Sequence, residues 1–347
     1  MTFILGIESS CDETAAAVVE NGRVVQSNIV ASQDELHNEY GGVVPEIASR
    51  AHLERILPVV SRAIKDARIE LQDIDAIAVG NRPGLIGSLL VGVSAAKALA
   101  WTLNKPLITV DHVVAHLFAP FLSGEEVTYP ALGIVVSGGH TSLLLLQDAN
   151  SAECLGKTID DAAGEAFDKA ASILGLGWPG GARIDKAAAK GTPRYKLPRP
   201  KTRGCRPDFS FSGLKTALLY GVRGNPNRKE GKIVFPKEVS DLTEQEICDW
   251  AASFQQAAVG AIVHGLQHAL EDNDVRCIVA GGGVLANSLL RKELEETAAS
   301  SNIPIHLPDF KFCVDNAAMI AGLGYHLYEI GHRDQLNITA SPKGIAS

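Results

Sequence analysis

The order of expected strands and helices occurs twice along this chain of 347 residues. In each half, an apolar strand, a polar loop and two returning strands precede alternating helical and strand patterns. The opening strands are expected at 3–7, 15–19 and 23–30 in the first half, and at 131–136, 142–146 and 154–158 in the second. Two halves with the same order of elements are expected to form two sheets of the same topology. The sequence therefore predicts a duplicated α/β fold.

The length supports two domains, since an ordinary domain has roughly 100–200 residues. We place the boundary near residue 126, which gives domains of residues 1–125 and 126–347. Residues 190–245 are rich in Pro and in charges of both signs, and we interpret them as a basic, Pro-rich insertion outside the core. The last helical pattern, which begins near Asp315, is expected to be a terminal helix that packs back on the first domain.

Charge and cysteine content exclude several classes of protein. Lys plus Arg is 32 against 40 Asp plus Glu, so the net charge of -8 attracts neither nucleic acid nor anionic membranes globally. The 6 Cys are far apart and form no CxxC pair, which favours a reducing compartment. The first residues lack a basic leader pattern, and the apolar segment 85–96 is too short to span a bilayer. We therefore expect a cytoplasmic protein with no membrane contact.

Turns of small residues lie at corresponding places in the two halves: Ser9-Ser10, Ser137-Gly138-Gly139 and Gly281–Gly283. Each alone is also explained as a tight turn. Together they predict a nucleotide clamp, because backbone N–H groups can converge on an anion where no bulky Cβ intervenes. The run GGGVLA, with Asp309 downstream, also fits a Rossmann fingerprint. We disfavour that alternative because the fingerprint would lie late in the chain, in a domain opened by an antiparallel hairpin.

His112 and His116 are four residues apart and directly follow an apolar strand. On a helix they share one face and can hold one metal ion, at the end of a strand where open α/β sheets bind ligands. His264 and His268 have the same spacing inside a long helical pattern, where we interpret them as surface histidines. Asp315 is a candidate third ligand, and a helix N-cap is an equally open interpretation of it.

At this point several motifs identify a family. They are ESSCDETA (8–15), GGVVPEIASRAH (41–52), PGLIG (83–87), HVVAH (112–116), VSGGHT (136–141), DDAAGEAFDK (160–169), FSFSGLKT (209–216), GGGVLAN (281–287) and DNAAMI (315–320). Together they closely resemble the bacterial tRNA N6-adenosine threonylcarbamoyltransferases (TsaD), a family once labelled O-sialoglycoprotein endopeptidase or glycoprotease. The resemblance runs from residue 3 to about 325.

The resemblance implies a duplicated actin-like (Hsp70/sugar-kinase-type) ATPase fold with two facing RNase H-like domains. It implies an acyltransferase that moves the threonylcarbamoyl group of threonylcarbamoyl-AMP to the N6 amine of the adenosine 3′ to the anticodon. The tRNAs concerned read codons that start with adenine. ATP or ADP is a further candidate occupant of the same site.

Site residues carry over from the family position by position. His112, His116 and Asp315 would hold one divalent metal, taken to be Fe²⁺, with zinc as the alternative. The resemblance implies a substrate-binding set of Val135, Val136, Ser137, Gly138, Gly139, Asp168, Gly181, Asp185 and Asn287. The general base stays unassigned. His140 is a candidate for it, and a structural hydrogen bond is an equally open role for that residue.

The implied partners are tRNA, an inactive paralogue (TsaB-like) and a small P-loop ATPase (TsaE-like). For the tRNA, a local group of cations is available in the Pro-rich segment: Arg194, Lys196, Arg199, Lys201, Arg203 and Arg206. A solvated loop is the alternative interpretation of that segment. The chain departs from many relatives at Val114, where they carry Glu, and the stretch 222–247 is longer than usual.

Three other functions compete with this one. An actin-like ATPase or small-molecule kinase without a tRNA substrate shares the phosphate loops but has no use for the histidine pair. A metallopeptidase of the HExxH type needs Glu directly after the first histidine, where this chain has Val113. A non-catalytic assembly partner similar to the short paralogue lacks the histidine pair that is present here.

Overall fold

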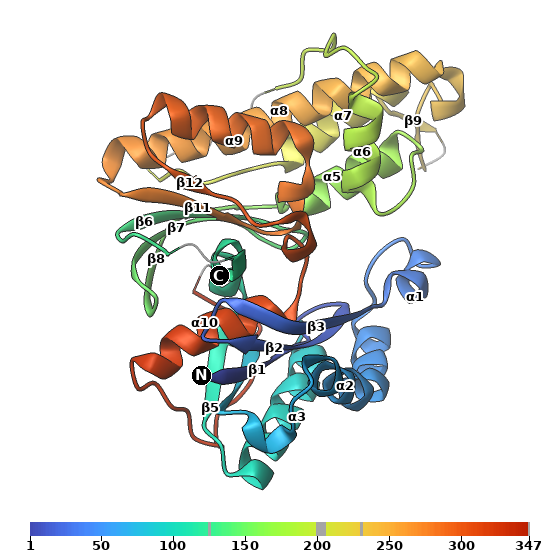
Figure 1. Cartoon of the computed structure of the whole chain (residues 1–347). Coiled ribbons are helices and arrows are strands. Elements are labelled where there is room, and N and C mark those ends of the chain that lie inside the picture. The colour runs from blue at the N-terminus through green and yellow to red at the C-terminus, as the bar shows by residue number, and fades with distance from the viewer. Residues whose placement is uncertain (124–125, 199–205, 230–231, 346–347) are drawn as a thin grey trace.

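The computed structural model describes residues 1–123, 126–198, 206–229 and 232–345. Two five-stranded sheets form the centres of two lobes, one above the other in Figure 1. The first sheet has the order β3-β2-β1-β4-β5, with β1 Phe3–Glu8, β2 Glu13–Glu20, β3 Val24–Ser32, β4 Ala76–Arg82 and β5 Leu107–Asp111. The second has the order β8-β7-β6-β11-β12, with β6 Ala131–Val136, β7 Thr141–Asp148, β8 Ser151–Lys157, β11 Cys277–Gly281 and β12 Ile305–His306.

The two sheets have the same topology. In each, three antiparallel strands are followed by two strands that pair in parallel beside the first one. The predicted duplication is therefore confirmed, and its cause is visible in the sequence. β6 is apolar along its whole length, β1 is apolar up to its last residue, Glu8, and both are buried on both faces, as the central strands of such a sheet must be.

Helices cover both sheets. The first lobe has α1 Asp34–Asn38, α2 Pro45–Ala67, α3 Ile86–Leu103 and α4 His112–His116. The second has α5 Ala163–Ile173, α6 Gly180–Ala188, α7 Ser212–Arg223, α8 Glu244–Asp272 and α9 Ser288–Ser300, with a small ribbon of β9 Asn227–Lys229 and β10 Lys232–Val234. α2 and α3 pack on one face of the first sheet. The last helix, α10 Ala317–Glu329, lies on its other face against β1, β2 and β4 (Figure 1).

The core has three parts. One lies between the first sheet and α2 and α3. A second contains α4, α10 and residues of both sheets, and therefore joins the lobes. The third fills the second lobe around α5, α7 and α8.

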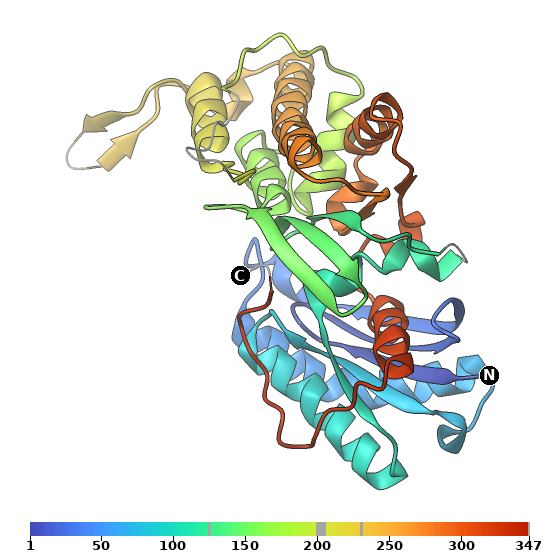
Figure 2. The same ribbon diagram turned by 90° about the vertical axis from the view of Figure 1, so that its left-hand side faces the viewer.

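The chain after α10 returns along the first lobe. The N–H of Asp334 donates to Leu107 O at 2.8 Å, and the N–H of Ser341 donates to Asn81 O at 2.9 Å. Figure 2 shows this segment in red, passing along the outside of the lobe towards the end of the chain. It thus covers β5, which is the edge strand of the first sheet.

The interpretation of residues 190–245 as an insertion outside the core needs correction. The segment contains α7 and the extended residues that precede it. Five apolar side chains in this part are at most 2% exposed: Phe209, Phe211, Leu214, Leu218 and Val222. Their spacing changes from two to three and four residues, so they pack first as an extended segment and then as a helix face. Of the cations expected in this region, Arg199, Lys201 and Arg203 lie outside the described residues.

α3 is longer than the apolar segment 85–96 from which it was expected. The helix continues to Leu103, and by length and composition it could cross a membrane. In the structure one face of it is buried against β4 and α2 through Leu89, Val93 and Ala96.

Candidate functional site

The two histidines lie on α4, a single helical turn that follows β5 directly. Asp111 caps this turn, and its Oδ1 accepts hydrogen bonds from the N–H groups of Val113 and Val114 at 3.0 and 3.2 Å. Because residues i and i+4 share a helix face, the rings of His112 and His116 meet edge to face with centroids 4.8 Å apart. A strand followed at once by the histidine pair thus places both imidazoles at the carboxyl end of the first sheet.

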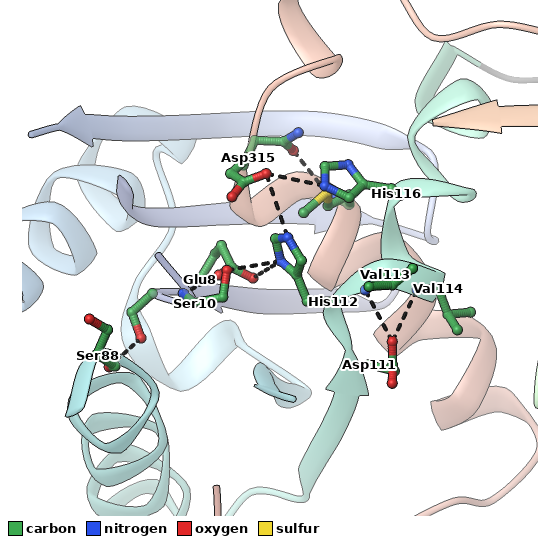
Figure 3. A network of polar contacts seen from close by, with 12 residues as sticks. Glu8, Ser10, Ser88, Asp111, His112, Val113, Val114, His116 and Asp315 are labelled. Atoms are coloured by element: carbon green, nitrogen blue, oxygen red, sulfur yellow. Dashed lines mark hydrogen bonds and ion pairs between the residues drawn. The ribbon is translucent and has the colours of Figure 1, made fainter. Parts of the chain in front are cut away.

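Asp315 brings a carboxylate to both imidazoles (Figure 3). Its Oδ1 lies 3.1 Å from His116 Nε2 and 3.5 Å from His112 Nε2. The alternative role as a helix cap belongs instead to Asn316, whose Oδ1 accepts from the N–H of Met319 at 3.0 Å. Ligand atoms of the three residues lie within 4.8 Å of one another, which fits a single ion.

The charges of this group favour a cation. Burial opposes charge on His112, but the carboxylates of Glu8 and Asp315 outweigh burial and raise the pKa of His112 to about 10. Burial also acts on Asp315, yet His112 and His116 hold the pKa of this carboxyl well below its ordinary value. The local field therefore stabilises positive charge between these side chains, as a metal site requires.

The ring of His116 is the observation that fits a metal most directly. The residue is 0% exposed, and neither of its ring nitrogens has a hydrogen bond among the described residues; the short contact to Asp315 lacks hydrogen-bond geometry. A buried polar group without a partner costs about 1–3 kcal/mol. Two imidazoles and one carboxylate are also the donor set of non-haem iron(II) sites and of three-ligand zinc sites.

The second histidine pair has different surroundings. His264 and His268 lie on α8, where His264 is exposed and His268 is half-buried. Within the described residues neither belongs to a group of three potential metal ligands. Their interpretation as surface histidines therefore agrees with the structure.

The glycine turn of the second lobe presents bare backbone. Cβ atoms built on Gly138 and Gly139 would meet nothing within 4 Å. Gly164, in the first turn of α5, supports the turn, because a Cβ there would lie 2.7 Å from Gly138 Cα. The expectation that backbone N–H groups of Ser137–Gly139 bind anions is wrong for Ser137, whose N–H donates to His140 O at 2.7 Å.

The end of β11 joins this turn to the histidines. Gly282 has a φ of +103°, and a Cβ there would lie 2.4 Å from Val136 O. A Cβ on Gly281 would lie 2.3 Å from His116 O. Only glycine allows β11 to pass this close to α4 and to the end of β6. Val135 and Val136, which end β6, are buried.

Asp168 and Gly181 come together at the start of α6. Asp168 Oδ1 accepts from the N–H of Gly180 at 2.6 Å, and a backbone bond from Gly181 adds to it. Burial nevertheless raises the pKa of Asp168. A Cβ on Gly181 would meet nothing within 4 Å, so the backbone there is open to a ligand.

Asp185 and Asn287 form a second pair of candidate residues. Asp185 Oδ1 accepts from the hydroxyl of Ser288 at 2.8 Å. Asn287 caps α9, and its side-chain amide donates to Gln255 Oε1 at 2.8 Å. These polar side chains therefore tie the N-terminus of α9 to α6 and α8.

His140 is poorly suited to act as a general base in this arrangement. Burial, with the charges of His112 and His116, lowers the pKa of His140 to about 4. A general base is most effective when its pKa lies near the working pH.

Sequence reasoning gave no role to Glu8, which contacts His112 (Figure 3). Glu8 Oε2 lies 3.0 Å from His112 Nδ1, although the two residues are 104 positions apart. The sequence feature that could have selected Glu8 is a charged residue at the end of an otherwise apolar strand. Ser10 also differs from expectation, because its N–H donates to Glu8 Oε1 at 2.5 Å and its hydroxyl oxygen lies 3.2 Å from the same histidine nitrogen.

Comparison with known sequences identifies relatives along nearly the whole chain. The family described as tRNA N6-adenosine threonylcarbamoyltransferase (TsaD) matches residues 24–322. A protein of that name from Symbiobacterium thermophilum is 50% identical over 341 residues, covering 98% of this chain and 96% of the relative. Another, from Treponema denticola, is 49% identical over 343 residues, with 98% and 96% covered.

Solved structures support the fold alone. HypF of T. kodakarensis superposes with a TM-score of 0.60 at 16% identity, over 94% of this chain and 48% of HypF. Component A of the Acidaminococcus fermentans (R)-2-hydroxyglutaryl-CoA dehydratase superposes with a TM-score of 0.52 at 13% identity, over 94% and 97% of the two chains. The expected actin-like architecture is confirmed by these neighbours together with the duplicated sheets.

Proposed function

This chain belongs to the tRNA N6-adenosine threonylcarbamoyltransferase (TsaD) family, and from that premise we propose that its histidine pair and Asp315 hold a divalent metal beside the bound acyl adenylate. The chain is an acyltransferase. It transfers the threonylcarbamoyl group of threonylcarbamoyl-AMP to the N6 amine of the adenosine 3′ to the anticodon, in tRNAs that read codons starting with adenine. The alternative of a kinase or ATPase without tRNA is not supported, since these relatives carry the transferase name.

The acyl group is already activated in the adenylate, so the protein has mainly to position the amine and stabilise the developing negative charge. The open backbone of Gly138 and Gly139 is suited to the negative oxygens. The N-terminus of α6, open at Gly181, is a second place where N–H groups can meet hydroxyl or phosphate oxygens. Asp185 and Asn287 are suited to the ribose and the base.

The metal proposal depends on the three side chains described above. His112 and His116 would bind through Nε2 and Asp315 through Oδ1, and we propose Fe²⁺, with zinc as the alternative. When bound, the ion supplies Lewis acidity towards an oxygen of the substrate. Asp111 keeps the imidazoles on one face by capping α4.

The cations that meet the tRNA are proposed in the Pro-rich segment before α7. Arg194 is 65% exposed and lies 3.3 Å from Asp249, while Lys196 is exposed beside it. Arg206 is bound to the backbone, donating to Cys154 O at 3.0 Å. If Arg194 and Lys196 contact phosphates, replacing both by Ser lowers tRNA affinity and reduces the salt slope by about 1 per contact. Lys292→Ser on α9, which is 66% exposed, is the matched control.

We also propose a cytoplasmic protein that works with an inactive paralogue and a small P-loop ATPase. The family resemblance supports these partners. The apolar side chains of Leu53 and Leu57 on α2 and Leu90 on α3 are 50–67% exposed, and exposed apolar helix faces of this kind are typical of protein interfaces. Leu57→Glu should weaken co-elution with the paralogue, whereas Ile330→Glu, at a side chain 61% exposed elsewhere, should not.

The decisive test is the transfer reaction with purified protein, threonylcarbamoyl-AMP and unmodified tRNA. We expect threonylcarbamoyladenosine in the tRNA, loss of product with a chelator, and recovery on adding Fe²⁺. His112→Ala should abolish both product and metal binding, while His264→Ala, from the pair with the same spacing on α8, should change neither. Full activity and full metal content in His112→Ala would contradict the metal site and leave the family activity standing.

A further inference from the structure

The polar loop after β1 uses hydrogen-bonding groups of both its serines for contacts within the protein. In its sequence, Ser9-Ser10 looks like an anion-binding turn, the counterpart of Ser137-Gly138-Gly139. In the structure, the Ser9 hydroxyl donates to Ser88 O at 2.9 Å, and the Ser10 N–H is used by Glu8. The two turns therefore differ, since Gly138 and Gly139 face open space.

Glu8 uses both of its carboxylate oxygens. Oε1 accepts from the N–H of Ser10, and Oε2 lies 3.0 Å from His112 Nδ1 (Figure 3). The side chain is 0% exposed, so neither contact competes with water. Gly80 leaves room for this carboxylate, because a Cβ on Gly80 would lie 2.7 Å from Glu8 Oε2.

An ionised carboxylate has no proton to donate, so His112 Nδ1 must be the donor in this contact. When a metal ion takes the place of the hydrogen on the other nitrogen, Nε2, the ring is neutral and keeps its hydrogen on Nδ1. Nε2 is the atom that faces Asp315. The contact with Glu8 thereby fixes both the tautomer and the ring orientation that a metal ligand needs.

We propose that the Glu8–Ser10 loop is a positioning element for His112 and not a phosphate-binding loop. Glu8 is a positioning residue that acts through His112. This inference rests on the metal site proposed above and adds a role to residues outside it. A fully buried negative charge at this place also disfavours a phosphate nearby, which leaves anion binding to the open glycines of the second lobe.

Glu8→Gln separates the two roles of the loop. The amide has one acceptor oxygen for two N–H donors, so either Ser10 or His112 Nδ1 then faces an NH₂ group. If His112 turns Nδ1 into an acceptor, its proton moves to Nε2 and blocks the metal. We therefore expect the affinity of the full chain for Co²⁺ to fall roughly 10- to 100-fold, the range found for such partners of metal-binding histidines.

The experiment measures Co²⁺ binding by titration and AMP binding by calorimetry. Wild type, Glu8→Gln, Glu8→Ala and His112→Ala are compared, with thermal melting to establish that each variant is folded. We expect both Glu8 variants to weaken Co²⁺ binding and to bind AMP as wild type does. A variant that does not fold is replaced by Glu8→Asp. This variant keeps the negative charge but places it farther from His112, so it should weaken Co²⁺ binding less than Glu8→Gln or Glu8→Ala.

Two results would overturn the inference in different ways. If His112→Ala abolishes Co²⁺ binding while the folded Glu8 variants bind Co²⁺ as wild type does, the metal site stands and the positioning role is wrong. If the Glu8 variants change AMP affinity tenfold and leave Co²⁺ affinity unchanged, the loop is a phosphate loop after all. If His112→Ala itself binds Co²⁺ normally, the metal site fails and the positioning role fails with it.

Discussion

A neutral imidazole can bridge two parts of a chain only when its tautomer matches both partners, and His52 is such a residue. His52 is buried on α2. Its Nε2 lies 3.0 Å from Cys11 O, and its Nδ1 lies 2.8 Å from Thr14 Oγ1. A carbonyl oxygen only accepts, so Nε2 donates and Nδ1 accepts from the hydroxyl. This neutral histidine thereby ties α2 to the loop between β1 and β2.

Because the bridge needs a neutral ring, its contribution should depend on pH. Burial lowers the pKa of His52 below its ordinary value of about 6.5. The unfolded chain therefore binds more protons than the folded one as pH falls through 6.5, and the stabilisation is lost towards acid. We expect His52→Ala to cost about 2 kcal/mol at pH 7, for two hydrogen bonds, and less at pH 5.

The measurement is urea unfolding of wild type and His52→Ala at both pH values, and only the difference between the two proteins is compared. Using this difference removes the effects of other titrating groups. A difference that grows towards pH 5 would show that His52 is charged in the folded protein, contrary to the tautomer assigned here.

Gly164 gives a second prediction at this scale. Gly164→Ala places a Cβ 2.7 Å from Gly138 Cα and 2.7 Å from Ser137 O, so the anion-binding turn must move. We expect AMP affinity to fall at least tenfold with metal binding retained. Gly213→Ala on α7 is the control, since its Cβ would meet nothing within 4 Å. Equal AMP affinity in both variants would argue against a ligand at this turn.

Residue types alone predicted part of the candidate site. Spacing and the preceding strand were enough to select His112 and His116, because both signals are local. Asp315 needed the family resemblance to complete the set, since it lies about two hundred positions away. Glu8 could not be assigned, because its role exists only once β1 and β5 are placed in one sheet.

At the scale of elements, the central strands were the most predictable part of the fold. β6 begins and ends where its apolar run does, and β1 extends only one residue beyond expectation. α6 and α7 were missed for a physical reason. Both begin among Gly, Pro and Ser, which weaken the local helical signal, and their stability comes from packing against α5 and α8.

α8 allows a direct test of helix propensity. Gly260 lies inside this helix of 29 residues, and a Cβ built on it would meet nothing within 4 Å. Gly260→Ala should therefore raise the free energy of unfolding by about 0.5–1 kcal/mol, measured from the urea midpoint at an unchanged slope. Gly221→Ala is the contrasting variant, because its Cβ would lie 2.3 Å from the ring of Trp250, and it should destabilise the protein. A loss of stability in Gly260→Ala would mean that α8 is not continuous at this position.

At the scale of the whole molecule, the sequence predicted the two lobes and the last helix that packs back on the first lobe, but not the segment that follows this helix. The chain crosses to the second lobe after β5 and returns through α10, so the first lobe is completed by residues distant in sequence. The segment after α10 then follows β5 from Leu107 to Asp111. No local pattern marks such a return, because its hydrogen bonds join it to residues more than 200 positions away, such as Asn81, Lys97 and Thr109.

The returning segment predicts that the end of the chain matters for the stability of the first lobe. Ile345 donates its N–H to Asp111 Oδ2 at 2.9 Å, on the side chain whose other oxygen caps the histidine helix. Together with the bond from Ser341 to Asn81, these contacts should contribute about 1–3 kcal/mol, at about 0.5–1.5 kcal/mol each.

Deleting residues 334–347 removes these contacts together with the pairing of Asp334 with Leu107. The truncation should therefore lower the urea midpoint and expose part of the β5 edge, which favours association between chains. Light scattering at increasing protein concentration detects that association. Leu336→Ala, at a side chain 44% exposed in the same segment, is the control and should leave both measurements unchanged. If the truncated protein is as stable as wild type and stays monodisperse, the structural role of the segment is contradicted, because the edge of β5 then does not depend on it.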